Sequence, residues 1–272
     1  MSKYSSQFVG SIPGHYEDGL GPHIFVDYAR EMAERVASLE PRRLLELAAG
    51  TGIVTRALRQ ALPASTHITA TDLNPPMLDV AREKLADAAN LAFEPADATA
   101  LPFDDASFDA IVCQFGVMFF PDKDQHYREV YRVLRPGGRY LFSVWDSFDH
   151  NPFARIAHET IGSFFSSDPP AFYQVPFSYR ALDPIKASLE GAAFRGVGFE
   201  LIGIEKEIPD ATLFARGLVY GNPAIDEIRS RGSAGPEAVT AALADALRAE
   251  FGEDPGRMSL QAIVVSAAKP VA

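Results

Sequence analysis

The sequence predicts an α/β protein whose core is a mostly parallel sheet with helices on both faces. Seven short apolar runs occur along the chain, and stretches with apolar residues at helical spacing separate most of them. Apolar runs that alternate with helices are typical of βαβ units, in which successive strands lie parallel in one sheet. No internal repeat or low-complexity tract interrupts this order.

The expected elements follow one another regularly. A helix is predicted over 22–38. Strands are predicted at 43–48, 67–71, 91–93, 108–115 and 139–145, with a helix after the first of them and further helices at 74–89 and 122–135. In the segment LRPGGRYLFSVW, Pro136, Gly137 and Gly138 end a helix and lead into the fifth strand. The remainder predicts helices at 152–165 and 184–194, strands at 198–208 and 258–267, and a helical insert at 210–254 that includes an alanine-rich helix at 236–251.

The composition limits the kinds of partner. The 272 residues are 47% hydrophobic and carry a net charge of -11, with a sequence pI near 5.0. Binding along a phosphate backbone calls for clustered Lys and Arg, so no nucleic-acid partner is expected. Cys113 is the one cysteine, which excludes an internal disulfide and suits a reducing compartment. Without a signal-peptide core or a run long enough to span a bilayer, the sequence predicts a cytoplasmic protein with no membrane insertion.

The stretch LLELAAGTGIVTRAL, residues 44–58, leads from an apolar run through a small-residue turn into a helix. No Lys-Ser/Thr pair follows the glycines, which excludes a P-loop. A dinucleotide fingerprint needs a third glycine three residues after the second, and Thr55 stands there. Asp72 ends the next strand, twenty residues after Gly52, where an acidic side chain can accept both hydroxyls of a ribose. The predicted ligand is therefore a nucleoside with little or no phosphate.

Four motifs in order give residues 42–146 a specific resemblance. They are ELAAGTG at 46–52, TATDLNPPMLDVAREK, EPADATALPFDDASFDAIVCQFGVMFF and EVYRVLRPGGRYLFSVWD. Together they resemble the core of class I S-adenosylmethionine-dependent methyltransferases, in the small-molecule branch related to quinone-precursor methyltransferases. The resemblance implies a Rossmann-like, mostly parallel seven-stranded sheet with its last strand antiparallel, and S-adenosyl-L-methionine as the cofactor.

The resemblance also implies roles for residues of the first two motifs. Glu46 would order the first turn and lie near the methionine ammonium group. The backbone of Ala48 and Gly50 would approach the methionine part, and Asp72 would bind the ribose hydroxyls. Ala48 stands where the family pattern has a glycine, which adds a methyl group where the cofactor passes closely.

Residues of the later motifs would complete the cofactor site. Leu73 and Met77 would pack on the adenine or the ribose. Asp97 would accept a hydrogen bond from the adenine amino group, and the Ala98 N–H would meet a ring nitrogen. Gln114, just past the fourth strand, would face the methionine end, because a buried amide that interrupts an apolar run needs partners.

Two further residues are candidates for a general base, which a protonated acceptor would require. His15 lies in the N-terminal segment and His150 follows the fifth strand, on the strand-end side where open α/β sheets bind ligands. The glycine- and proline-punctuated segment 10–25 suits a mobile lid, with Tyr16 closing over the methionine end and His15 nearby. No spacing of residues indicates a metal site.

The expected organisation is an N-terminal lid and helix over 1–39 and a methyltransferase domain over 40–272, with accessory segments at about 151–183 and 210–254. The insert is longer than the connection between two neighbouring strands needs, which points to a functional or interfacial part. With the aromatic segment 168–182, it is expected to form a cap over the acceptor pocket. A dimer contact or a decoration without function is the alternative, and a homodimer stays open.

The predicted function is transfer of a methyl group from S-adenosylmethionine to a small-molecule acceptor by direct in-line displacement. The protein aligns a nucleophile with the methyl carbon, because the sulfonium already carries a good leaving group. A catalytically silent S-adenosylmethionine-binding module and, with less support, an NAD-dependent dehydrogenase are the alternatives. The sequence leaves open which acceptor is used and whether oxygen, nitrogen or carbon is methylated.

Overall fold

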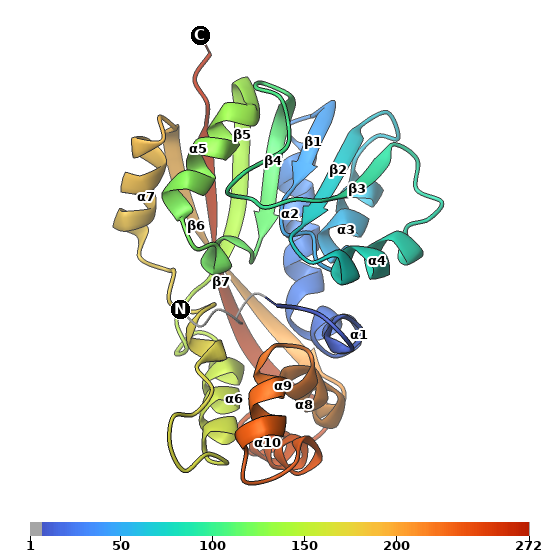
Figure 1. Cartoon of the computed structure of the whole chain (residues 1–272), viewed down its shortest axis with the longest axis vertical. Coiled ribbons are helices and arrows are strands. Elements are labelled where there is room, and N and C mark those ends of the chain that lie inside the picture. The colour runs from blue at the N-terminus through green and yellow to red at the C-terminus, as the bar shows by residue number, and fades with distance from the viewer. Residues whose placement is uncertain (1–6, 272) are drawn as a thin grey trace. The chain divides into compact units, whose positions relative to one another are not determined.

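A computed structural model describes residues 7–271, so the first six residues of the expected lid lie outside the described residues. The chain divides into two compact units (Figure 1). We call Asp27–Val144, Arg180–Ile202 and the residues from Ile263 onward the sheet unit. We call the residues up to Val26, Trp145–Tyr179 and Gly203–Ala262 the helical unit.

The sheet has seven strands in the order β3-β2-β1-β4-β5-β7-β6. Six strands are parallel and the last is antiparallel, which confirms the fold class that the sequence predicts. In register, Leu44 pairs with Ile68 on one side and with Ala110 on the other. The strands are β1 (Arg43–Glu46), β2 (His67–Asp72), β3 (Leu91–Pro95), β4 (Phe108–Gln114), β5 (Leu134–Trp145), β6 (Arg195–Ile208) and β7 (Gly256–Ala268). Of these, β5, β6 and β7 contribute residues to both units.

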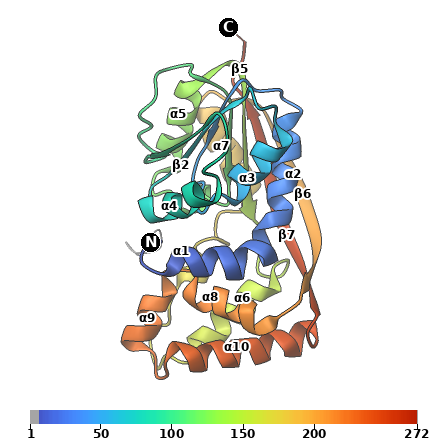
Figure 2. The ribbon, with the colours of Figure 1, turned by 90° about the vertical axis from the view of Figure 1, so that its right-hand side faces the viewer.

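Both faces of this sheet carry helices, because the strand order reverses between β1 and β4. Right-handed crossovers place α3 and α4 on one face and α5 on the other. Figure 1 shows α5 in front of the strands and α2 behind them, and Figure 2 gives the second view. The helices of this unit are α2 (Val26–Ala37), α3 (Ile53–Ala61), α4 (Pro75–Lys84), the short 3₁₀ turn η2 (Val117–Phe119), α5 (Lys123–Val133) and α7 (Leu182–Gly191).

The central strands are buried on both sides, which explains their continuous apolar sequence. Leu44 and Leu45 of β1 are fully buried, as are the residues from Ala110 to Cys113 of β4. Parallel strands that helices cover on both faces have no polar-facing side, so their sequences do not alternate. Polar residues occur at the carboxyl ends of these strands, beside the point where the strand order reverses. This edge of the sheet is therefore the expected ligand site.

The helical unit is built around one helix, α8, which packs against η1, α9 and α10. Its other members include α6, which packs against α10 and η3. Among the described residues, no helix is both long enough and apolar enough to pass through a bilayer. The helices are α1 (Ile12–His15), the π-helix η1 (Tyr16–Phe25), α6 (Pro152–Gly162), η3 (Phe172–Gln174), α8 (Ala211–Tyr220), α9 (Ala224–Arg231) and α10 (Pro236–Phe251).

The N-terminal segment differs from its sequence-based interpretation. The sequence predicts a Gly- and Pro-punctuated stretch before a helix that begins at 22, whereas the structure is helical from Ile12 and continues into α2. Gly19 lies directly against Gly217 of α8, and a Cβ on Gly19 would be 2.5 Å from the Gly217 Cα. These glycines therefore allow two helices to approach closely. Local sequence rules read them as helix-breaking residues, so the helix from Ile12 to Phe25 is not predicted.

The fifth strand also begins earlier than predicted, at Leu134 instead of 139. Leu134 pairs with Phe108, and Arg139 pairs with Ala110, so the register shifts across the intervening residues. The Pro-Gly-Gly sequence that ends α5 thus lies inside the strand as an irregularity.

The close approach of α8 and η1 gives a stability prediction. A Cβ at Gly217 would lie 2.6–2.9 Å from backbone atoms of Gly19, so Gly217→Ala forces the two helices apart. We expect the free energy of unfolding to fall by about 1–3 kcal/mol, as overpacking typically costs. Gly191→Ala, at the end of α7, is the matched control, because its Cβ would meet nothing within 4 Å. Urea unfolding measures both, and equal stability of the two variants would contradict the close contact.

Candidate functional site

The first turn of the site joins β1 to α3 and is fixed by backbone hydrogen bonds to neighbouring strands. The Leu47 N–H donates to the Val112 carbonyl at 2.8 Å, and the Ala49 N–H donates to the Thr71 carbonyl at 2.8 Å. The turn is therefore held between β4 and β2, the neighbours of β1 on either side. Such a rigid small-residue turn lets a ligand approach the backbone closely.

Glu46 ends β1 with a carboxyl group that is almost completely buried, at 1% exposure. Burial raises the pKa of Glu46 to about 8, and the nearby Asp72 carboxylate adds to the rise, while hydrogen bonding at Thr55 opposes it. Its Oε2 atom has no hydrogen-bond partner among the described residues. A buried carboxyl oxygen without a partner is costly and calls for a polar ligand. The methionine ammonium group that the resemblance implies fits this oxygen in charge and in donor chemistry.

Asp72 joins the first turn to the second. Its Oδ2 accepts a hydrogen bond from the Gly50 N–H at 2.9 Å, and its Oδ1 accepts one from the Asn74 N–H at 2.8 Å. Burial raises the pKa of Asp72, and these two backbone bonds counter part of the rise. The Asn74 side-chain Nδ2 also donates to Oδ1, at 3.3 Å. The structure thus brings Glu46, Gly50 and Asp72 together, and the Asp72 Oδ2 keeps a lone pair that a ligand hydroxyl can use.

Ala48, which departs from the family pattern, adopts a left-handed conformation with φ of 52°. An alanine in that region costs about 1–2 kcal/mol relative to the ordinary helical conformation. Its methyl group lies against Gly116, where a Cβ would be only 2.6 Å from the Ala48 Cβ. Gly116 therefore supplies the space that this alanine needs within the sheet unit.

The two apolar candidates of the second motif have different surroundings. Met77 is buried, and its Cε would lie 3.3 Å from a Cβ on Gly50, so it packs beneath the first turn. Leu73 is 57% exposed, which is unusual for a large apolar side chain in this chain. Leu73 is free to cover a ligand, whereas Met77 supports the turn from the core side.

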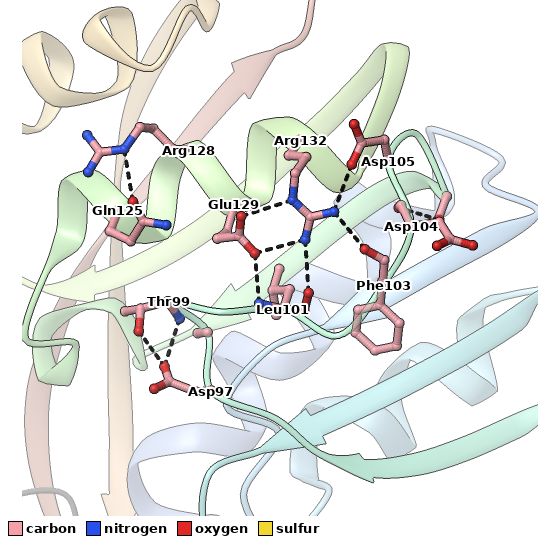
Figure 3. A network of polar contacts seen from close by, with 12 residues as sticks. Asp97, Thr99, Leu101, Phe103, Asp104, Asp105, Gln125, Arg128, Glu129 and Arg132 are labelled. Carbon is pink, nitrogen blue, oxygen red and sulfur yellow. Dashed lines mark hydrogen bonds and ion pairs between the residues drawn. The ribbon is translucent and has the colours of Figure 1, made fainter.

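The third motif forms a turn that is closed by its own side chains. Asp97 is exposed, and its Oδ1 accepts hydrogen bonds from the Thr99 N–H at 2.8 Å and the Thr99 hydroxyl at 2.7 Å (Figure 3). Ala98 is buried and its carbonyl oxygen lies 3.0 Å from His126 Nδ1. This arrangement leaves the second Asp97 oxygen available to an amino group of a ligand.

His126 is a supporting residue that lies between the third and fourth motifs of the sequence and that neither motif includes. It is fully buried between the Ala98 carbonyl and the Tyr140 hydroxyl, which lies 2.8 Å from its Nε2. Burial lowers the pKa of His126 to about 4, so the ring is neutral at physiological pH. The neutral ring donates from Nδ1 to Ala98 and accepts at Nε2 from Tyr140, which fixes the position of the Ala98 backbone.

Arg132 of α5 holds the loop that follows the third motif. It donates to the carbonyl oxygens of Leu101 at 2.9 Å and Phe103 at 2.7 Å, and to the carboxylates of Glu129 and Asp105 at 2.8 Å each (Figure 3). Glu129 in turn accepts from the Leu101 N–H at 2.8 Å, and Arg132 lowers the pKa of this carboxyl group. In the sequence, this pair is indicated by the spacing of Glu129 and Arg132, which lie three residues apart on one helix.

Gln114 ends β4 opposite Ser143 of β5 and is partly buried. The next residue, Phe115, has a left-handed backbone with φ of 52°, which is rare for an aromatic residue, and its ring packs edge-on against Tyr28. Burial raises the pKa of Cys113 to about 12, so this thiol acts as a small apolar side chain.

The remaining candidates, His15, Tyr16 and His150, lie in the helical unit. The Tyr16 ring stacks on Phe25 with 4.9 Å between ring centroids, and the His15 ring lies 5.1 Å from that of Tyr220. Burial and the charge of Arg216 lower the pKa of His15. His150 is exposed, and the roles of all three stay predictions. In residues 7–271, no group of three or more His, Cys, Asp or Glu side chains could hold a metal ion.

Comparison with known proteins supplies the context for this site. A family model described as a methyltransferase domain matches residues 45–142. The demethylmenaquinone methyltransferase of Deinococcus radiodurans is 42% identical over 115 residues, which cover 42% of this chain and 47% of that protein. The match therefore spans just under half of that relative. The demethylmenaquinone methyltransferase of Thermus thermophilus is 34% identical over 188 residues, which cover 65% of this chain and 81% of that protein.

Solved structures resemble most of the chain at lower identity. The crystal structure of the YcgJ protein from Bacillus subtilis has a TM-score of 0.58 and 21% identity, and it covers 90% of this chain and 100% of that one. At this identity the likeness shows a shared fold.

The burial of His126 gives a pH-dependent stability prediction. Its folded pKa of about 4 lies below the ordinary value of 6.5, so the unfolded chain binds the additional proton between these values. The stabilisation is complete above pH 6.5 and is lost as the pH falls towards 4. Wild type should therefore lose about 3 kcal/mol more unfolding free energy than His126→Asn over this window.

Urea unfolding at pH 7 and pH 4 measures this difference. Comparing the two proteins cancels the contribution of Glu46, whose raised pKa acts in the opposite direction. The same pH dependence in both proteins would show that His126 is not held neutral in the fold.

Proposed function

The chain belongs to the class I S-adenosylmethionine-dependent methyltransferases, and from that premise we propose that it methylates a small ring-containing acceptor related to quinone precursors. Its reaction is the transfer of a methyl group from S-adenosylmethionine to a small molecule. The cofactor supplies a methyl carbon on a positively charged sulfur, which makes S-adenosylhomocysteine a good leaving group. The chain's own residues bind the cofactor, orient the acceptor and exclude water.

The observation that carries cofactor binding is the buried Glu46 carboxyl group with its unpartnered Oε2. A structural carboxyl group in this position would be expected to have its hydrogen bonds satisfied within the protein. In this proposal Glu46 receives the methionine ammonium group, and Asp72 receives the ribose hydroxyls. The other residues of the sheet unit that are assigned to the cofactor are Ala48, Gly50, Leu73, Met77, Asp97, Ala98 and Gln114.

The proposed acceptor class rests on two sources of support. Two relatives are named demethylmenaquinone methyltransferases, and the acceptors of such enzymes are ring compounds. The helical unit is rich in aromatic contacts: Trp145 stacks on Phe177, with 5.9 Å between ring centroids, and Phe148 lies 5.1 Å from Phe177. Phe148 is half-buried, so part of this aromatic cluster is accessible to a ring compound.

We assign acceptor selection to the helical unit, which contains most of the accessory segments 151–183 and 210–254. The methyltransferase-domain model ends at residue 142, before both segments begin. Segments outside a shared catalytic core are where related enzymes differ in specificity. The chain's acceptor is therefore expected to differ in detail from those of the relatives.

The alternatives have less support. The turn lacks the third glycine of a dinucleotide site, and the relatives are methyltransferases, so an NAD-dependent dehydrogenase is not favoured. A silent binding module would keep Glu46 and Asp72 but would not transfer the methyl group. A cytoplasmic location is part of the proposal, because the one thiol suits a reducing compartment. So is the absence of a nucleic-acid partner, which the net charge of -11 supports.

Substitution of Asp72 tests the cofactor assignment. Asp72→Asn removes the charge that would hold the ribose hydroxyls, and one charge-assisted bond is worth about 1.5–3 kcal/mol. We expect the dissociation constant of S-adenosylhomocysteine to rise about tenfold or more, as measured by calorimetry. Asp79→Asn is the control, because Asp79 is exposed on α4 and, among the described residues, pairs with Arg82 alone, at 2.8 Å. Unchanged affinity in a folded Asp72→Asn protein would overturn the ribose assignment.

A further inference from the structure

The segment that follows β5 places a carboxylate, a hydroxyl and an imidazole together in the helical unit. His150 Nδ1 lies 3.1 Å from the Ser147 Oγ and 3.5 Å from the Asp146 Oδ2. The three residues fall within five positions of the chain, directly after the end of a parallel strand. In open α/β sheets, residues that follow such strand ends are the ones that meet ligands.

Asp146 is held firmly in this cluster. Its Oδ1 accepts from the Ser147 N–H at 2.7 Å, and its Oδ2 accepts from the Gln261 Nε2 at 2.6 Å. The Gln261 backbone is itself tied to the buried Asn151 side chain, which accepts from its N–H at 3.0 Å and donates to its carbonyl at 2.9 Å. The carboxylate is therefore positioned by two elements of the helical unit and is not a mobile surface group.

The position of this carboxylate favours one tautomer of His150. A proton on Nδ1 faces the Asp146 carboxylate and can be donated to the Ser147 hydroxyl, whereas a bare Nδ1 would face a negative charge. With the proton on Nδ1, the Nε2 atom carries a lone pair. Nε2 has no hydrogen-bond partner among the described residues, and the side chain is 55% exposed. The base nitrogen is thus open to a ligand.

We propose that Asp146 and His150 are a proton-accepting pair, in which His150 Nε2 removes the proton of a hydroxyl group on the methyl acceptor and Asp146 positions the ring. This inference rests on the proposed methyltransferase function and adds the chemistry of the acceptor. The acceptor class is a ring compound with an ionisable hydroxyl group.

The proton and electron balance is complete. The hydroxyl O–H bond breaks and its proton moves to His150 Nε2, which gives an imidazolium beside the Asp146 carboxylate. The electron pair that is left on the acceptor forms a bond from its oxygen, or from the conjugated ring carbon, to the methyl group. The bond between sulfur and the methyl carbon breaks, and its electrons leave with the neutral S-adenosylhomocysteine. Loss of the imidazolium proton to water restores the pair. For attack by carbon, the ring C–H proton leaves to solvent and the oxygen regains a proton, so one proton is released in all.

The other histidines lack this combination. His126 uses both ring nitrogens, and His23 is buried with its Nδ1 2.8 Å from the Gly19 carbonyl. His158 Nε2 lies 3.2 Å from the Gln174 side chain. Burial and the charges of Arg216 and Arg229 lower the pKa of His15, while the charge of Asp18 opposes them. Within residues 7–271, His150 is the one histidine at ion-pair distance from a carboxylate.

The first test reads the tautomer and needs no acceptor. Long-range proton–nitrogen NMR at pH 8 distinguishes the two neutral imidazole tautomers, and His150→Gln identifies the signal. We expect the Nδ1–H form in wild type and in Ser147→Ala, and a shift towards the Nε2–H form in Asp146→Asn. The Nε2–H form in wild type, or no change in Asp146→Asn, would overturn the positioning role of Asp146.

The second test measures methyl transfer from S-adenosylmethionine to 1,4-dihydroxynaphthalene, 1-naphthol and phenol. His150→Gln should lower kcat at least about 100-fold with little change in the affinity for S-adenosylhomocysteine, since a general base contributes about 10²–10⁴-fold. Added imidazole should restore part of the rate in this variant, which a structural defect would not allow. Asp146→Asn should lower kcat less, and His67→Gln, at the exposed start of β2, should match wild type.

The outcomes separate this inference from the proposed function. Wild type that fails to bind S-adenosylhomocysteine would overturn the cofactor assignment and the inference with it. Wild type that binds it but methylates none of the three hydroxyl compounds would overturn the hydroxyl acceptor alone. Transfer that persists at the wild-type rate in His150→Gln would overturn the base, while the methyltransferase function would stand.

Discussion

The burial of two carboxyl groups at the ends of neighbouring parallel strands is the constraint on which the rest of the structure depends. Glu46 and Asp72 are both almost inaccessible to solvent, and the Asp72 carboxylate adds to the cost of ionising Glu46. Asp72 offsets part of this cost through the backbone N–H groups of Gly50 and Asn74. Glu46 keeps an oxygen without a partner among the described residues, so its ionised form is unfavourable until a cation lies there.

The surrounding residues fix the loops that carry these groups. Gly116 makes room for the left-handed Ala48, and His126 fixes the Ala98 backbone as a neutral donor and acceptor. Arg132 satisfies the carbonyl oxygens of the loop that follows. Gly116, His126 and Arg132 need not contact a ligand themselves. Each fixes a backbone segment that belongs to the proposed cofactor site. A site supported in this way is organised before the ligand binds, which reduces the ordering cost of binding.

The sheet and the cofactor turn were predictable because local patterns of the sequence determine them. The alternation of apolar runs with helices gave the strand positions, and the turn from Glu46 to Gly52 with Asp72 after the next strand indicated a nucleoside ligand. The π-helix η1 was missed because its glycines fit against α8, a contact far away in the sequence. The roles of His126 and Asp146 were missed for the same reason, since their partners are set by tertiary packing.

The most direct test of the central claim is the number of protons released when S-adenosylhomocysteine binds. With a pKa of about 8, Glu46 is mostly protonated at pH 7, and pairing with the ligand ammonium group requires its ionised form. Calorimetry at pH 7 in phosphate and Tris buffers, whose ionisation enthalpies differ, gives this number. The account predicts release of about one proton by wild type and none by Glu46→Gln. Tight binding by wild type without proton release would contradict it.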